Sequence, residues 1–229
     1  MFGLKWKAKD FFYMFIAGLF VVIFTALVYY AMDNKMVVVD EHHPESQKVL
    51  NPIDDDFIIG DLNAPVEVVF YGEFTCHHCM RFMKDTFLKL RDEYIFRKKV
   101  KFIFRPVISS KRSLFGAKFL FCDKRTNEEN SDILWKMFEN KWMISSDYLN
   151  ALAKLVRREH WTSNEHFVEC INSKSIQDNL RQMSKKTIEP LNIHETPHVF
   201  VNKMPTSSDK SIFYIIDKEY KNLIKNKQH

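Results

Sequence analysis

The chain has 229 residues, of which 46% are hydrophobic, 14% aromatic and 28% charged. This composition is sufficient for a packed core and excludes a disordered chain, while five Gly and seven Pro exclude collagen-like and linker-like classes. The formal net charge of +5 comes without a long Lys/Arg run, so we expect no nucleic-acid partner.

The N-terminal part contains an uncharged apolar run of 21 residues, from Phe11 to Ala31. At about 1.5 Å per residue it would span roughly 31 Å, which matches a bilayer core of about 30 Å. Lys5, Lys7 and Lys9 precede it, and this positive flank favours a cytoplasmic N-terminus. We therefore expect a cytoplasmic N-terminus and transmembrane anchor over residues 1–32, which attaches the protein to the membrane.

The anchor predicts that the rest of the chain is exported, to the periplasmic side of the cell inner membrane. A cleaved signal peptide, leaving a soluble periplasmic protein, is the alternative. Its apolar core would normally be about 7–15 residues, and Tyr29 makes a cut after Ala31 unfavourable. The polar segment 33–56, with Pro44 and Pro52, is interpreted as a tether.

An α/β pattern begins at Phe57. β-Branched and aromatic residues predict a strand over 66–71, and the alternation in "VKFIFRPV" predicts another over 100–107. Between them, apolar residues from Met80 to Tyr94 recur every three or four positions, which indicates an amphipathic helix. Strand, helix and strand without a hairpin turn predict a βαβ unit with parallel strands.

Helical spacing then continues over residues 109–190, and a strand pattern returns at 198–202. A last helix is expected to begin near Ser208 or Asp209. The prediction is one α/β domain, divided into 57–108 and 191–229, with 109–190 inserted as an all-helical subdomain.

The candidate site is "CHHC", residues 76–79, between a strand and a helix start. Free N–H groups and the helix dipole at that position stabilise a thiolate, so Cys76 should have a lowered pKa. Cys79 lies one turn inside the helix and should be more buried and less nucleophilic. His77 and His78 are expected to add partial positive charge. A stabilised dithiol form makes the disulfide form a strong oxidant.

Other interpretations of this motif remain open. A Zn site needs four ligands, and one C-x-x-C supplies two, so a distant pair would have to complete it. A purely structural disulfide is also possible. Covalent haem attachment is excluded because Met80, not His, follows the second cysteine. We expect neither a bound cofactor nor a metal.

Two segments resemble the DsbA-like thiol:disulfide oxidoreductases. "IIGDLNAPVEVVFYGEFTCHHC" is similar to that family's entry to the active site, and "ETPHVFVNK" to its Thr-Pro loop and following strand. The helical block lies between them, as in the family. The resemblance, over roughly 57–225, implies a thioredoxin-like fold with an inserted helical subdomain.

The resemblance also assigns roles to individual residues. It makes Cys76 the exposed nucleophile and Cys79 the resolving cysteine. His78 matches the histidine that stabilises the thiolate, whereas His77 stands where Pro or Tyr is commoner in the family.

Further roles come from the loops that the family places beside the cysteines. Pro197 matches a cis-proline facing the disulfide, preceded by Thr196, whose backbone would bind an extended substrate. The alternative is an ordinary trans proline opening an edge strand. Glu73 matches an acidic residue that relays protons to Cys79, or is a solvated carboxylate at a strand end.

Cys122 and Cys170 both fall in the helical block. In an exported protein two such thiols can form a structural disulfide, and the alternative is a pair of buried free thiols.

The function that we expect is an exported oxidoreductase that donates the Cys76–Cys79 disulfide to substrate proteins with paired thiols, through a mixed disulfide. The resemblance implies re-oxidation by a membrane quinone-linked oxidase. One alternative is an isomerase or reductase of the same fold. Another is a non-enzymatic module that binds a metal or a partner.

Overall fold

The structure is a computed structural model that describes residues 18–26, 48–54, 56–123, 126–139, 157, 165–206 and 209–227. The chain divides into two units, Met1–Val38 and Val39–His229. In the first unit residues 18–26 are helical, and the rest of the predicted 11–31 span lies outside the described residues. Among those that are described, no helix combines the length and the apolar character needed to cross a membrane. Most of the predicted tether is likewise outside the described part.

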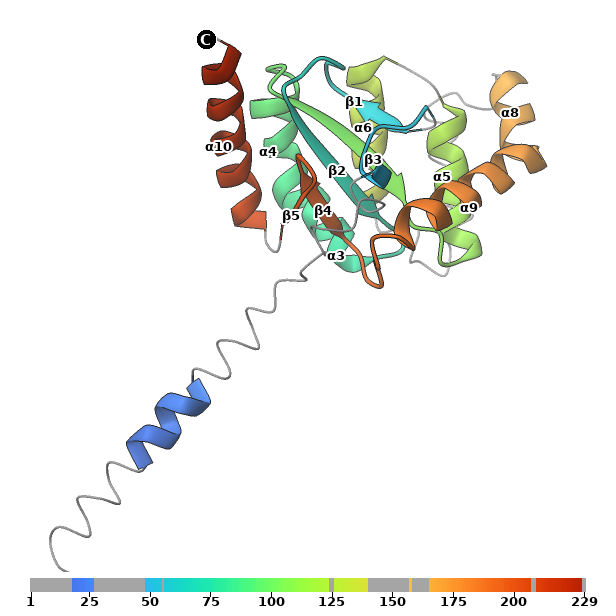
Figure 1. The fold of residues 1–229 in the computed structure, drawn as a ribbon. Coiled ribbons are helices and arrows are strands. Elements are labelled where there is room, and N and C mark those ends of the chain that lie inside the picture. Colours follow the sequence, from blue (N-terminus) through green and yellow to red (C-terminus); the bar gives the residue numbers. More distant parts are fainter. Residues whose placement is uncertain are drawn as a thin grey trace, which may run out of the picture. The chain divides into compact units, whose positions relative to one another are not determined.

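The second unit contains a five-stranded sheet with the strand order β1-β3-β2-β4-β5 (Figure 1). Strands β2 and β3 are parallel, and every other neighbouring pair is antiparallel. The sequence pattern predicted β2, β3 and β4 but not the three-residue edge strands β1 and β5. The strands are β1 (Phe57–Ile59), β2 (Val66–Gly72), β3 (Val100–Pro106), β4 (His198–Val201) and β5 (Met204–Thr206).

A helical stretch connects β2 to β3, as the βαβ pattern predicts. It is not a uniform α-helix, because two π-helical segments interrupt it, but its apolar side stays buried throughout. Its segments are α3 (His77–Phe82), η1 (Met83–Phe87), α4 (Leu88–Leu90) and η2 (Arg91–Ile95).

Both faces of the sheet are covered. On one face Phe70 of β2 stacks on Phe82 of α3, with ring centroids 4.7 Å apart. On the other face Tyr71 meets Phe200 of β4 edge to face, with centroids 5.9 Å apart. Because side chains alternate along a strand, consecutive residues of β2 reach the two cores. The sheet is therefore fixed from both sides, which holds the end of β2 and the start of α3 in place.

The described helices between β3 and β4 pack against one another (Figure 1), and their buried residues join the core on the Phe70 face of the sheet. Ile188, at the end of α9, packs against the core on the Tyr71 face. Within the predicted helical block 109–190, residues 140–164 lie outside the described residues apart from Arg157. A long helix follows β5. These helices are α5 (Lys111–Cys122), α6 (Asn127–Glu139), α8 (Glu165–Asn172), α9 (Lys174–Ile188) and α10 (Asp209–Lys227).

Candidate functional site

Cys76 is the N-cap of α3, where β2 has ended and the helix begins. Its backbone is extended, with φ −86° and ψ 122°, and its Sγ accepts a hydrogen bond from the N–H of Cys79 at 3.4 Å. The sulfur also lies 3.2 Å from the carbonyl oxygen of Thr196, to which the thiol donates when it is protonated. Cys76 is half-buried, whereas Cys79 is buried.

The surroundings of Cys76 favour its thiolate. Its pKa falls from 9.0 to about 5, chiefly because the Cys79 thiol donates a hydrogen bond to the sulfur. Burial opposes this shift, and bonds from the Thr196 side chain and from backbone N–H groups support it. At neutral pH the sulfur is therefore ionised and ready to react, since the thiolate is the nucleophile.

Cys79 has the opposite character. Its side chain is fully buried, and burial is the main reason that the pKa of its thiol is raised. Its hydrogen bond to Cys76 raises the pKa further, and the backbone N–H of Glu73, 3.4 Å from the sulfur, opposes this. The two cysteines thus differ in the direction that the spacing predicts, with a half-buried thiol of lowered pKa beside a buried thiol of raised pKa.

The loop before β4 faces Cys76. The Thr196–Pro197 peptide bond is cis, and both residues are half-buried. His198 braces this loop, because its Nδ1 lies 2.8 Å from the carbonyl oxygen of Glu195. A carbonyl can only accept, so Nδ1 carries the proton and donates it.

Glu73 lies between β2 and α3, and its backbone N–H contacts the sulfur of Cys79. Its Oε1 accepts hydrogen bonds from the hydroxyl of Thr75, at 2.6 Å, and from the hydroxyl of Ser109. Ser109 precedes the N-cap of α5, so this contact joins the active-site loop to the first helix of the inserted block.

His77 and His78 begin α3, and both side chains are exposed. The backbone N–H of His78 helps to lower the pKa of Cys76, whereas neither imidazole is among its causes. The predicted charge effect of the two rings therefore stays a prediction.

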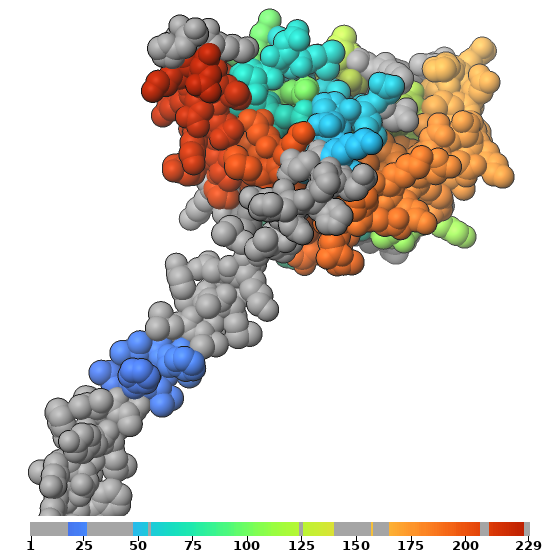
Figure 2. Space-filling model, in the orientation of Figure 1, coloured from blue at the N-terminus to red at the C-terminus, as the bar shows by residue number. Residues whose placement is uncertain are grey.

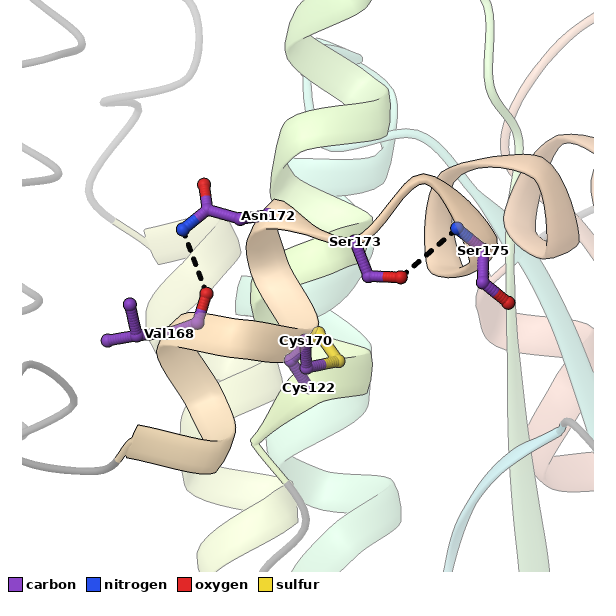
Figure 3. The surroundings of a disulfide bond; sticks show 6 residues. All are labelled: Cys122, Val168, Cys170, Asn172, Ser173 and Ser175. Carbon is purple, nitrogen blue, oxygen red and sulfur yellow. Dashed lines mark hydrogen bonds between the residues drawn. A yellow bond between two sulfur atoms is a disulfide. The ribbon is translucent and has the colours of Figure 1, made fainter.

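Cys122 and Cys170 form a disulfide, with an S–S distance of 2.00 Å and a Cα–Cα distance of 5.7 Å. Figure 3 shows that the bond joins the end of α5 to α8. Ser173, three residues after Cys170, then caps α9 through a 3.1 Å bond from the N–H of Ser175. This pair lies in the helical block, separate from Cys76 and Cys79.

The sequence did not indicate two polar residues that form hydrogen bonds with the loops of the site, Ser109 and His198. Ser109 belongs to a Ser-Ser pair just before α5, so an N-cap signature marks its neighbour Ser110 but not its bond to Glu73. His198 follows Pro197 at a strand start, and no sequence signal indicates its contact with Glu195. Both contacts join residues that a single-sequence pattern treats separately.

Known proteins are similar to this chain in sequence. The family model described as Thioredoxin matches residues 53–218. A Rickettsia conorii protein that carries the name protein-disulfide oxidoreductase is 28% identical over 179 residues, covering 72% of this chain and 64% of the relative. The chain therefore spans a little under two thirds of that protein's length. Disulfide bond formation protein D of Bacillus subtilis is 26% identical over 152 residues, covering 63% of this chain and 67% of that protein.

Solved structures show a similar fold. The crystal structure of Wolbachia pipientis alpha-DsbA1 superposes with a TM-score of 0.71 and 26% identity, covering 79% of this chain and 98% of that one.

Proposed function

The chain belongs to the thioredoxin family, in which it is DsbA-like, and from this premise we propose that it is a protein thiol:disulfide oxidoreductase acting as a dithiol oxidase. It would donate the Cys76–Cys79 disulfide to substrate proteins with paired thiols. The observation that carries the proposal is the contrast between the two sulfurs, one half-buried with a pKa of about 5 and one buried with a raised pKa.

The exchange proceeds in two balanced steps. A substrate thiolate attacks Sγ of Cys76, so a substrate–Cys76 bond forms, the Cys76–Cys79 bond breaks, and Cys79 leaves and takes up a proton. The second substrate thiolate then attacks the sulfur of the first substrate cysteine in the mixed disulfide. This forms the substrate disulfide and releases Cys76 as a thiolate. The substrate loses two electrons and the protein dithiol gains them.

The local geometry supports each step. Cys76 is the better leaving group because hydrogen bonds stabilise its thiolate, which favours the reduced protein as product. The carbonyl of Thr196, 3.2 Å from Sγ, belongs to a loop that would align an extended substrate beside Cys76. Glu73 is positioned by Thr75 and Ser109 and would relay the proton to or from Cys79.

The test is stoichiometric oxidation of a peptide that contains two cysteines. Oxidised wild-type protein should convert about one equivalent of peptide to its disulfide, measured by mass spectrometry, and Cys76→Ser should convert none. The variant retains Cys122 and Cys170 and so serves as the matched control for that pair. Retention of peptide oxidation by Cys76→Ser would rule out the proposal.

The direction of transfer is tested by equilibrium with glutathione. A potential near that of DsbA, about −120 mV, is expected for an oxidase. A potential near that of thioredoxin, about −270 mV, would instead assign the protein as a reductase or isomerase.

We also propose that the protein acts on the periplasmic side of the inner membrane, held by a helix over the apolar run 11–31, and that a membrane quinone-linked oxidase takes up its electrons. The run and its three preceding lysines support the anchor. Fractionation of cells should find the full-length chain in the membrane. Recovery of a shortened, soluble periplasmic form would indicate a cleaved signal peptide.

A further inference from the structure

A groove of about 250 Å³ lies between α5 and α9, outside the cysteine site. We propose that it docks an acidic segment of the substrate protein, so that substrates with a carboxylate and an apolar side chain near their cysteine pair are oxidised preferentially. This inference rests on the proposed function and adds a substrate class to it. The groove is lined by Lys111, Leu114, Phe115, Lys118, Gln177 and Arg181.

The charge of the groove is one-sided. Lys111, Lys118 and Arg181 supply three positive charges, and none of them forms an ion pair within the described part of the chain. Helix α5 contains no Asp or Glu, and Asp178 of α9, which is exposed, is not part of the lining. A carboxylate is therefore the complementary group.

Lys118 shows why a partner would be favourable. Its side chain is half-buried between the helices, and burial lowers the pKa of its ammonium group. A charge that has lost part of its hydration without gaining a counter-ion is stabilised when a carboxylate arrives.

The floor of the groove is apolar. Leu114 is buried, and Phe115 is partly buried against the main core. The volume is below the roughly 300–1,000 Å³ of pockets that enclose drug-sized ligands. A short extended segment, with one apolar side chain on this floor and carboxylates near its rim, fits better than a cofactor.

Residues 108–110 connect the groove to the active site through hydrogen bonds on both sides. The N–H of Ile108 donates to Oγ of Ser184 on α9 at 3.0 Å, and Ser109 bonds Glu73. Ser110 then caps α5, so Lys111 stands two residues from Ser109. Figure 2 shows that part of the surface of α9, in orange, is exposed to solvent. One substrate could thus occupy the groove while its cysteine meets Cys76.

The experiment compares three dithiol peptides that differ only in a tail: Leu with three Glu, Leu with three Gln, and Leu with three Lys. Full-length oxidised protein should oxidise the Glu peptide faster than the Gln peptide, by on the order of tenfold in second-order rate at low salt. The advantage should fall as the Debye length shortens to about 8 Å near physiological salt. Equal rates for the Glu and Gln peptides would overturn the groove proposal while the Gln rate still measures the oxidase.

Variants localise the effect. Removing the three groove cations, as Lys111→Gln, Lys118→Gln and Arg181→Gln together, should abolish the preference and leave the Gln-peptide rate unchanged. The matched control removes three exposed cations elsewhere, as Arg97→Gln, Lys218→Gln and Lys221→Gln. It should keep the preference, and its loss there would overturn the proposal in favour of a general field effect.

Charge reversal gives a second test. Lys118→Glu with Arg181→Glu should shift the preference toward the Lys peptide.

A lipid-binding role is tested with anionic vesicles. If these vesicles abolish the oxidation of the Glu peptide at low micromolar peptide concentration, the groove is instead a lipid-binding surface, and this contradicts the proposal. If no peptide is oxidised at all, the proposed function fails, and this inference fails with it.

Discussion

Arg105 is a fully buried cation on β3 that fastens the segment before β1 to the sheet. Its guanidinium forms two bonds with the Asp56 carboxylate, at 2.7 and 2.8 Å. It also donates to the carbonyl oxygens of Val49 and Asn51 and to the hydroxyl of Tyr71. Removing the guanidinium would leave the buried Asp56 carboxylate without its counter-ion and the buried Tyr71 hydroxyl without this donor.

We expect Arg105→Met to lower the free energy of unfolding by about 3–5 kcal/mol, because it leaves the Asp56 carboxylate uncompensated. Urea unfolding followed by circular dichroism measures this. The control is Lys185→Met, which breaks the exposed pair with Glu189 and should cost less than about 1 kcal/mol. A loss for Arg105→Met no larger than that of the control would contradict this account.

At the residue scale, sequence reasoning identified Cys76 and Cys79 because a spacing of three at a helix start is a local feature. It did not identify Arg105 as buried. In β3, Lys101, Ile103 and Arg105 alternate with three apolar residues that face the other core. Segments distant in sequence cover Ile103 and Arg105. Burial of that second face depends on long-range packing, which the periodicity of one strand does not contain.

At the scale of elements, the disulfide between α5 and α8 closes a loop over a sequence separation of 48. Loop-closure entropy then predicts that Cys122→Ala with Cys170→Ala lowers the free energy of unfolding by up to about 4 kcal/mol. Urea unfolding of the oxidised double variant and of wild type measures the difference. An unchanged unfolding midpoint would show that the bond does not constrain the unfolded chain.

Long, strongly periodic elements were predictable from the sequence, and short ones were not. The strand over 66–71 and the helix after Cys79 follow from side-chain alternation and from three- and four-residue spacing. The strands β1 and β5 have three residues each, too few to establish a period. The π-helical segments were also not predicted, because their apolar spacing resembles that of an α-helix.

At the scale of the whole molecule, the thiolate of Cys76 links the stability of the reduced protein to pH. The pKa is about 5 in the folded protein and has an ordinary value of 9.0. A depressed pKa adds stability that is fully present above the unfolded value and is lost as the pH falls through the folded value. The reduced protein should therefore gain stability as the pH rises from about 5 to about 9.

Thermal unfolding of reduced wild type and of Cys76→Ser, both in the same reductant, measures this gain. The state of the Cys122–Cys170 pair is common to both and cancels. Burial, the main cause of the raised pKa of Cys79, is also common to both. The difference in Tm should grow steadily across that range in favour of wild type. A difference that does not change with pH would contradict the depressed pKa.

The most direct test of the account is a titration of Cys76 in the reduced, folded protein. Thiolate absorbance near 240 nm, with Cys76→Ser as the blank, should rise with a midpoint at about pH 5. The rate of alkylation at Cys76 should follow the same curve. A midpoint near pH 9 would show an ordinary thiol, and the proposed oxidase would lose its physical basis.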